Sequence, residues 1–114
     1  MLNRELLDRL THAFYVNDRD TILDFFTEDG TWQILGYKTL NGKAEMKAFV
    51  ARNTIDVVEA KRHRVIISGN TAVVDVEGKC IDGKGNVFEN WCCDIFEFEG
   101  DKVKSLKSFV VDKK

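Results

Sequence analysis

Hydrophobic residues in the first third of the chain recur every three or four positions, which is the spacing of amphipathic helices. The first apolar stripe is made of Leu2, Leu6, Leu7, Leu10, Ala13 and Phe14. Asn17 and Asp18 interrupt this stripe, and Asp18 is a good N-cap for a second, short helix. The buried side of that helix should hold Ile22, Leu23, Phe25 and Phe26. The pair Asp29-Gly30 should end it, so the pattern predicts two helices before residue 30.

A β-type run and a third helix follow, after which the hydrophobic period changes to two. Residues 31–35 form the β-type run, and Asn41-Gly42 precedes a helix with Met46 and Phe49 on its apolar side. From Ala60 onward, strands are expected at roughly 60–68, 71–81, 86–99 and 102–111. Short turns rich in Gly, Asn and Asp separate these four strands, which should therefore form an antiparallel meander. The predicted fold class is α+β.

The strand from Phe88 to Phe98 is apolar in the middle of both of its faces. One face carries Phe88, Asn90, Cys92, Asp94, Phe96 and Phe98, and the other carries Glu89, Trp91, Cys93, Ile95 and Glu97. Antiparallel sheets usually have one dry face and one wet face. The three helices can cover one face, but no further segment is left to cover Trp91, Cys93 and Ile95. We therefore expect a homodimer in which two sheets pack face to face through these three residues.

Length and composition restrict the class of protein. A chain of 114 residues predicts one domain, over residues 1–114, with a single core. The net charge of −2 argues against a nucleic-acid partner, for which a clearly basic domain is expected. No apolar run is long enough for a membrane span, so we expect no membrane partner and a cytoplasmic location. The three cysteines lack metal-site spacing, which predicts buried, reduced thiols and no metal site.

The order of these elements resembles that of the nuclear transport factor 2-like superfamily, and three local patterns support the resemblance. They are DTILDFFTEDGTW at residues 20–32, LNGK at 40–43 leading to Phe49, and CDIFEF at 93–98 followed by GDKV at 100–103. Members include SnoaL-type polyketide cyclases, ketosteroid isomerase, scytalone dehydratase and hexachlorocyclohexane dehydrochlorinase. The resemblance implies a cystatin-like cone, in which three N-terminal helices pack on a curved mixed, mainly antiparallel sheet around an internal cavity. It also implies dimerisation through the outer sheet face.

Asp94 is the strongest candidate for a polar group that acts in this cavity. It lies between Cys92 and Phe96 on the strand face that lines the cone in this superfamily. A carboxyl group there loses hydration and has no evident cationic neighbour, so its pKa should rise. A protonated carboxyl can donate a hydrogen bond to a carbonyl or a developing oxyanion, and ketosteroid isomerase has such a residue on the corresponding strand. Alternatively, Asp94 is satisfied by a hydroxyl of a neighbouring strand or by an interface partner.

His63 is the second candidate, because it shares a strand phase with Val65 and Ile67, opposite to Arg62. An inward-facing histidine could abstract a proton near neutral pH. The dehydrochlorinase and dehydratase branches resemble this arrangement, with a pocket histidine and an aspartate that orients it. The position matching that aspartate would be Asp18, or Asn17 if the shorter loop shifts the register. Alternatively, the histidine is structural and Asp18 only caps the second helix.

The general base of a steroid isomerase is missing from this chain. Near the end of the first strand, where the resemblance requires an aspartate, the chain has Ile34. The tyrosine that those enzymes carry inside the first helix corresponds to Leu10. A standard ketosteroid isomerase mechanism is therefore rejected. The chain has no nucleotide, flavin or metal motif, so the expected site works without a cofactor.

The remaining candidates shape the cavity rather than react in it. Its walls and hydrogen-bonding points are expected to be Trp32, Tyr37, Phe49, Phe88, Asn90, Phe96, Leu106, Ser108 and Val110. The predicted function is binding of a small apolar molecule, with catalysis as a cofactor-independent isomerase, cyclase or lyase if Asp94, His63 and Asp18 transfer a proton. The alternative is a non-catalytic ligand-binding or dimerisation domain. Converging titratable groups beside a cavity would favour the first function, and a sealed interior would favour the second.

Overall fold

The computed structural model describes residues 2–113, and its elements follow the predicted order, with one short strand, Lys38–Asn41, that the sequence did not predict. The elements are α1 (Arg4–Tyr15), α2 (Arg19–Phe25), β1 (Phe26–Ile34), β2 (Lys38–Asn41), α3 (Lys43–Arg52), β3 (Asp56–Ser68), β4 (Thr71–Ile81), β5 (Val87–Glu99) and β6 (Lys102–Asp112). Asp18 accepts a hydrogen bond from the backbone N–H of Thr21, which confirms that it caps α2. Within residues 2–113, no helix is both long and apolar enough to span a membrane.

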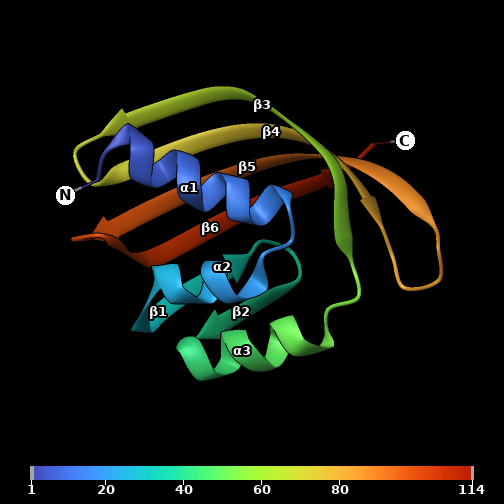
Figure 1. Ribbon diagram of the computed structural model, residues 1–114, viewed down its shortest axis with the longest axis horizontal. Coiled ribbons are helices and arrows are strands. Elements are labelled where there is room, and N and C mark those ends of the chain that lie inside the picture. Colours follow the sequence, from blue (N-terminus) through green and yellow to red (C-terminus); the bar gives the residue numbers. More distant parts are fainter. Residues whose placement is uncertain (1, 114) are drawn as a thin grey trace.

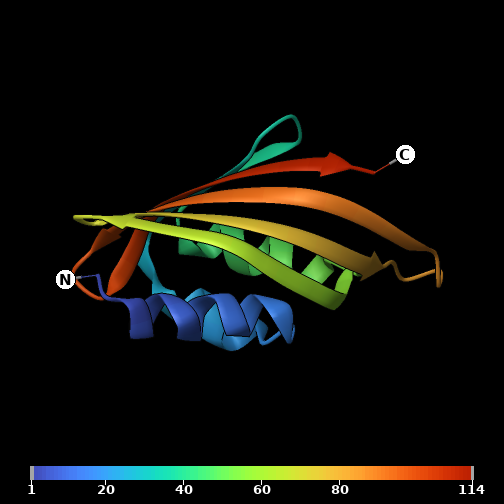
Figure 2. The same cartoon turned by 90° about the horizontal axis from the view of Figure 1, so that it is seen from above.

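The six strands form one sheet in the order β2-β1-β6-β5-β4-β3. Strands β3 to β6 pair as the predicted antiparallel meander. Strand β1 joins the meander by pairing with β6 in parallel, and β2 pairs with β1 antiparallel, so the sheet is mixed. The sheet is curved, and the three helices of the described chain lie on its concave side (Figures 1 and 2). This architecture confirms the predicted α+β class and the mainly antiparallel, mixed sheet.

The core fills the space between the helices and the concave face of the sheet. Its largest fully buried side chains are Phe26, Phe96, Leu7, Leu10, Leu40, Met46, Leu106, Val74 and Val103. Burying one such side chain stabilises the fold by about 1.5–3 kcal/mol. The turn between β4 and β5 extends beyond the ends of the helices (Figure 2), so the helices cover only part of the concave face.

The beginning of β1 differs from the prediction. Helix α2 ends at Phe25 and β1 begins with the next residue, whereas a strand was expected only from Thr31. Gly30 lies inside β1, where a Cβ atom would come within 3.2 Å of the carbonyl oxygens of Thr27 and Val103. The pairing of β1 with β6 shifts register just before Thr31. Asp29-Gly30 therefore marks a strand irregularity rather than the end of a helix, and glycine suits this close backbone approach because a Cβ atom would make tight contacts there.

The first half of β3 has the opposite phase to the one predicted. The pairing of β3 with β4 shifts register between Arg62 and Arg64. An inserted residue exchanges the faces of all side chains on one side of it. Val65 packs against the core as expected. Arg62 was expected on the opposite face, but it too points toward the helices. Its Nη1 donates to Oδ1 of Asp8 at 2.8 Å and to Oγ1 of Thr11 at 3.0 Å, both on α1.

Candidate functional site

A cavity of about 290 Å³ lies on the helix-covered side of the sheet, in the region of α3. Residues from β1, β5, β6, α1, α3 and two loops line it: Phe14, Trp32, Ile34, Tyr37, Phe49, Asn53, Ile55, Cys92, Asp94, Ser108 and Val110. Its volume is close to the lower end of the range for small-molecule sites. The cavity opens to solvent on the side of Tyr37, which is 73% exposed.

Trp32 is the centre of the aromatic wall of this cavity. Its ring makes edge-to-face contacts with Phe14, at 5.8 Å between centroids, and with Phe49, at 6.0 Å. On its other side it stacks on Phe26, at 6.0 Å. Tyr37 contacts Phe49 at 6.3 Å and extends the wall toward solvent. These arrangements are the ones aromatic pairs prefer, so they hold the wall in a defined shape.

The polar part of the cavity comes from two neighbouring strands. Asp94 of β5 and Ser108 of β6 are direct antiparallel partners, so their side chains lie side by side on the concave face. Trp32 Nε1 donates to Ser108 Oγ at 3.1 Å, which leaves the hydroxyl proton of Ser108 for its hydrogen bond to Asp94. Cys92 lies two residues before Asp94 on the same face, and its Sγ donates to Asp94 Oδ1 at 3.4 Å.

Burial raises the pKa of the Asp94 carboxyl. The hydrogen bonds from Ser108 and Cys92 favour the ionised form and oppose this shift, but the effect of burial is larger. Among the described residues that line the cavity there is no Lys, Arg or His to stabilise the carboxylate. The rise of the Asp94 pKa that the sequence predicts is therefore present in the structure, and its cause is loss of hydration.

We call the part of the cavity surface formed by Asp94 and Cys92 the cavity floor. The thiol of Cys92 is its second titratable group. Burial raises its pKa strongly, and the neighbouring Asp94 raises it further. A thiol with a raised pKa stays protonated at neutral pH and is a poor nucleophile. Cys92 therefore serves as a hydrogen-bond donor to Asp94, in agreement with the expectation of unreactive thiols.

The structure brings some of the predicted pocket residues together and separates others. Those that line the cavity are Trp32, Tyr37, Phe49, Asp94, Ser108 and Val110. Phe96 and Leu106 are at most 1% exposed and belong to the filled core instead. Phe88 and Asn90 lie farther along β5, outside this cavity, where the Asn90 Nδ2 contacts the Cys80 sulfur at 3.8 Å. The predicted pocket is thus divided between a cavity at one end of the concave face and solid core at the other.

His63 does not reach the cavity, and its predicted inward orientation is wrong. It lies beside the register shift in β3, on the outer face of the sheet. Its Nε2 is 2.9 Å from Oε1 of Glu77, whose other oxygen pairs with Lys113. Asp18 caps α2 and also accepts from the hydroxyl of Thr21 at 2.7 Å. Asp94, His63 and Asp18 are therefore in three separate places, and the histidine–aspartate pair does not form.

Several residues that line the cavity were not recognised from the sequence. Cys92 shares its strand phase with Asp94, and that periodicity could have identified it. Asn53 and Ile55 come from the loop between α3 and β3, where no hydrophobic period gives a signal. Ile34 was considered only as the position of an absent base, although it is part of the cavity wall.

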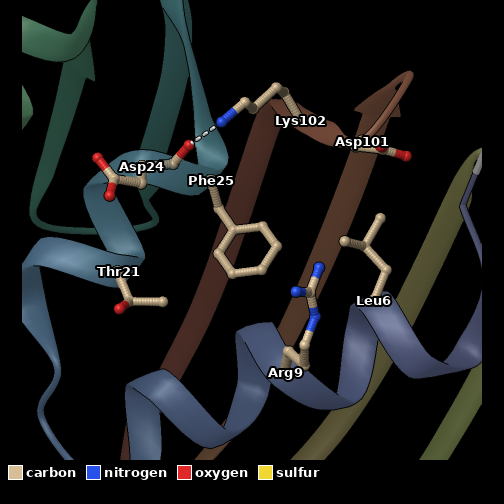
Figure 3. A pocket seen from close by; sticks show the side chains of 7 residues that line it. All are labelled: Leu6, Arg9, Thr21, Asp24, Phe25, Asp101 and Lys102. Atoms are coloured by element: carbon tan, nitrogen blue, oxygen red, sulfur yellow. Dashed lines mark hydrogen bonds between the residues drawn. The ribbon is translucent and has the colours of Figure 1, made fainter.

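A second hollow, of about 280 Å³, lies between α1, α2 and the β5–β6 turn (Figure 3). Its charged groups contact its own walls rather than converging on the space. The Arg9 guanidinium lies 5.7 Å from the Phe25 ring centroid. Lys102 Nζ donates to the backbone carbonyl of Asp24, near the C-terminus of α2, where a cation favourably meets the helix dipole. The first contact joins α1 to α2 and the second joins α2 to β6, so this hollow is a weaker candidate for a ligand site.

No curated protein matches the chain. Among solved structures, an NTF2-like protein of unknown function from Cytophaga hutchinsonii is 21% identical, with a TM-score of 0.75 over 94% of this chain and 97% of that one. An LEH-like epoxide hydrolase from M. tuberculosis is 16% identical, with a TM-score of 0.79 over 94% and 80%. A protein with a ketosteroid isomerase-like fold from Catenulispora acidiphila, in complex with trimethylamine, is 13% identical, with a TM-score of 0.78 over 94% and 85%.

At such identities these likenesses show a shared fold and nothing more specific. The family model of the SnoaL-like domain matches residues 7–106, which span α1 to the middle of β6 and include the cavity floor at Cys92 and Asp94. The match and the shared fold agree with the element order and with the curved, mixed sheet. The chain belongs to the SnoaL-like domain family, and it shares its fold with a solved NTF2-like protein.

Proposed function

We propose that the cavity binds a small, mostly apolar molecule and that protonated Asp94 donates a hydrogen bond to an oxygen atom of that molecule. The observation that carries this proposal is a carboxyl with a raised pKa that faces an aromatic-lined cavity. Ser108 and Cys92 both donate to Asp94, so they hold the carboxyl in position. A neutral carboxyl held in this way can polarise a ligand carbonyl without placing a full charge in an apolar space.

Binding is better supported than proton transfer, because the cavity lacks a separate base. Among the described lining residues, Asp94 is the sole carboxyl and there is no histidine. A proton-transfer reaction would therefore need Asp94 itself to act as the base after it ionises. The named relatives add support for a small-molecule site: one is an epoxide hydrolase and another holds trimethylamine.

Tryptophan fluorescence provides a direct test. The chain has two tryptophans, and Trp91 lies on the opposite face of the sheet from the cavity. In a Trp91→Phe background, Trp32 in the cavity wall is the single reporter. The probes are 1-tetralone and tetralin, which differ mainly by one carbonyl oxygen. Each is titrated against the background protein and against Asp94→Asn and Asp94→Ala variants at several pH values.

Asp94→Ala should reduce the preference for tetralone over tetralin about fivefold, since a net hydrogen bond contributes about 1 kcal/mol. In the protein with Asp94, the preference should fall as the pH rises through the pKa of that carboxyl. Asp94→Asn should keep the preference at every pH, because its amide always donates. A tetralone preference that is unaffected by Asp94→Ala would show that the proposed donor is wrong.

We also propose that the outer face of the sheet forms a homodimer. Trp91 is 48% exposed, and its cross-strand neighbour Val111 is 62% exposed. Cys93 and Ile95 continue the apolar patch along β5, and Phe109, which is opposite Cys93, is 40% exposed. An exposed apolar patch on two adjacent strands fits a second copy of the same surface, because a two-fold interface is self-complementary.

Sedimentation velocity tests the dimer. The unmodified chain should sediment as a dimer at micromolar concentration, and Phe109→Lys should shift it to a monomer. Val16→Lys is a matched control, because Val16 is 52% exposed but lies after α1, away from the outer sheet face. A monomeric unmodified chain, or a dimer that Phe109→Lys leaves intact, would contradict this interface.

A further inference from the structure

A second cavity adjoins the one described above. This second cavity has a volume of about 310 Å³, and we call it the mouth. The mouth is lined by Tyr37, Lys38, Phe49, Arg52, Asn53, Thr54 and Ile55. Four of these residues, Tyr37, Phe49, Asn53 and Ile55, also line the inner cavity. The mouth therefore lies next to the aromatic wall of the inner cavity, within reach of a ligand that extends along these shared residues.

The charged side chains that line the mouth are both positive. Lys38 and Arg52 line it, and no aspartate or glutamate does so among the described residues. Lys38 Nζ lies 5.9 Å from the Phe49 ring centroid, so the ammonium is beside the shared aromatic wall. Arg52 lies in the last turn of α3, where it complements the helix dipole. Within residues 2–113, neither cation forms an ion pair with a carboxylate, so both can meet a ligand anion.

Asn53 adds a neutral donor between the two cavities. Its Oδ1 accepts a hydrogen bond from the backbone N–H of Ile55 at 3.1 Å, which fixes the orientation of the amide. The Nδ2 group has no hydrogen-bond acceptor among the described residues, although Asn53 lines both cavities. Two cations and one amide donor beside an apolar channel are a suitable set of partners for an oxyanion.

We propose that the ligand is an amphipathic organic anion, whose apolar ring system fills the inner cavity and whose carboxylate or similar oxyanion binds in the mouth to Lys38, Arg52 and Asn53. This inference rests on the proposed function, because it assumes that the inner cavity holds the apolar part. It extends that function by assigning the chemical class of the ligand. The polar oxygen near Asp94 and the anionic group in the mouth are at opposite ends of the same molecule.

Two fluorescent probes with nearly the same rings test separately whether the inner cavity binds an apolar group and whether the mouth binds an anion. 1-Anilinonaphthalene-8-sulfonate carries an oxyanion, and N-phenyl-1-naphthylamine is its neutral counterpart. Only the fraction of each signal that 1-tetralone displaces is counted, which excludes probe on the outer sheet face. The sulfonate should bind more tightly than the neutral probe, and the difference should shrink as the salt concentration rises. The double variant Lys38→Met/Arg52→Met should weaken sulfonate binding about tenfold and leave the neutral probe unchanged.

The control is Lys84→Met/Lys104→Met, which removes the same charge from exposed positions outside the mouth. It should leave both affinities within twofold. If the two probes bind equally, or if the mouth variant weakens both alike, the anion site is wrong while the inner cavity stands. If tetralone displaces neither probe, the proposed function fails together with this inference.

Discussion

Replacing Asp94 with asparagine should change the way stability depends on pH. The raised pKa means that the folded chain keeps the Asp94 proton at pH values where the unfolded chain has released it. Ionised Asp94 therefore lowers stability, and this loss grows as the pH rises from the unfolded pKa toward the folded pKa. Asparagine has nearly the same shape, keeps a carbonyl oxygen that can accept from Ser108 or Cys92, and never ionises. Asp94→Asn should therefore be the more stable protein at neutral pH.

The magnitude follows from proton linkage. Below the reference pKa of 3.8, both proteins hold an uncharged group at this position, and their free energies of unfolding should agree. Above it, the difference should grow by about 1.4 kcal/mol per pH unit, which corresponds to one bound proton. It should become constant once the pH exceeds the folded pKa of Asp94. The height of this plateau, divided by 1.4 kcal/mol, measures the shift that burial produces.

Urea denaturation at half-unit pH steps measures these free energies, with both proteins at one concentration so that dimerisation has the same effect on each. The substitution leaves the other carboxyls with shifted pKa values in place. Their contributions to the pH dependence of the free energy of unfolding therefore cancel in the difference between the two proteins. Asp29→Asn is the matched control, because Asp29 is exposed on β1. Any pH-dependent difference that this control shows is subtracted as the general effect of removing one exposed carboxylate.

A difference between Asp94→Asn and the unmodified chain that is independent of pH would refute the reasoning. So would a difference of opposite sign, in which the unmodified chain gains stability relative to the variant as the pH rises. In the first case the hydrogen bonds from Ser108 and Cys92 would balance the effect of burial on the Asp94 pKa, and in the second they would outweigh it. Asp94 would then be ionised near neutral pH and could not act as the proposed donor.

Three further substitutions test the geometry of the fold and the site by chemical denaturation. Trp32→Phe keeps an aromatic wall but removes the hydrogen bond to Ser108, and it should cost about 1 kcal/mol; no loss would mean that this bond contributes nothing. Arg62→Met should cost roughly 1 kcal/mol because it breaks the contacts with α1, whereas outward-facing Arg64→Met should stay within about 0.5 kcal/mol. Equal effects of the two would contradict the strand bulge. Gly30→Ala should cost roughly 1–3 kcal/mol, since backbone carbonyls surround the added methyl group; a neutral result would show that β1 can relax there.

Much of the fold can be predicted from the sequence, because hydrophobic spacing and turn residues are local features of the chain. The spacing of threes and fours before Tyr15 and the period of two after Ala60 reflect the face that each element buries. Short Gly-, Asn- and Asp-rich turns fix neighbouring strands as antiparallel, and the structure confirms that meander. The parallel pairing of β1 with β6 has no such signal, because the two strands are far apart in the chain.

The error at His63 shows the limit of periodicity. Counting in twos from Val65 places His63 inside, and it would be inside if β3 were regular. One extra residue opposite β4 reverses the phase, so Arg62 meets α1 and His63 meets Glu77 on the outer face. The residues around His63 carry no local sequence signal that predicts this bulge. It depends on how β3 must bend to follow the curved sheet.

Asp94 itself could be placed on the correct face from sequence, since its strand is regular and its neighbours Cys92 and Phe96 share that face. The sequence by itself determined the three helices, the antiparallel meander and the presence of a carboxyl among apolar residues. Only the tertiary structure decided that Ser108 and Trp32 complete its hydrogen bonds, that Phe96 lies in filled core, and that a second cavity lined by Lys38 and Arg52 adjoins the first. Periodicity reports which face a side chain occupies, whereas a cavity and its mouth arise where distant segments fail to fill the space between them.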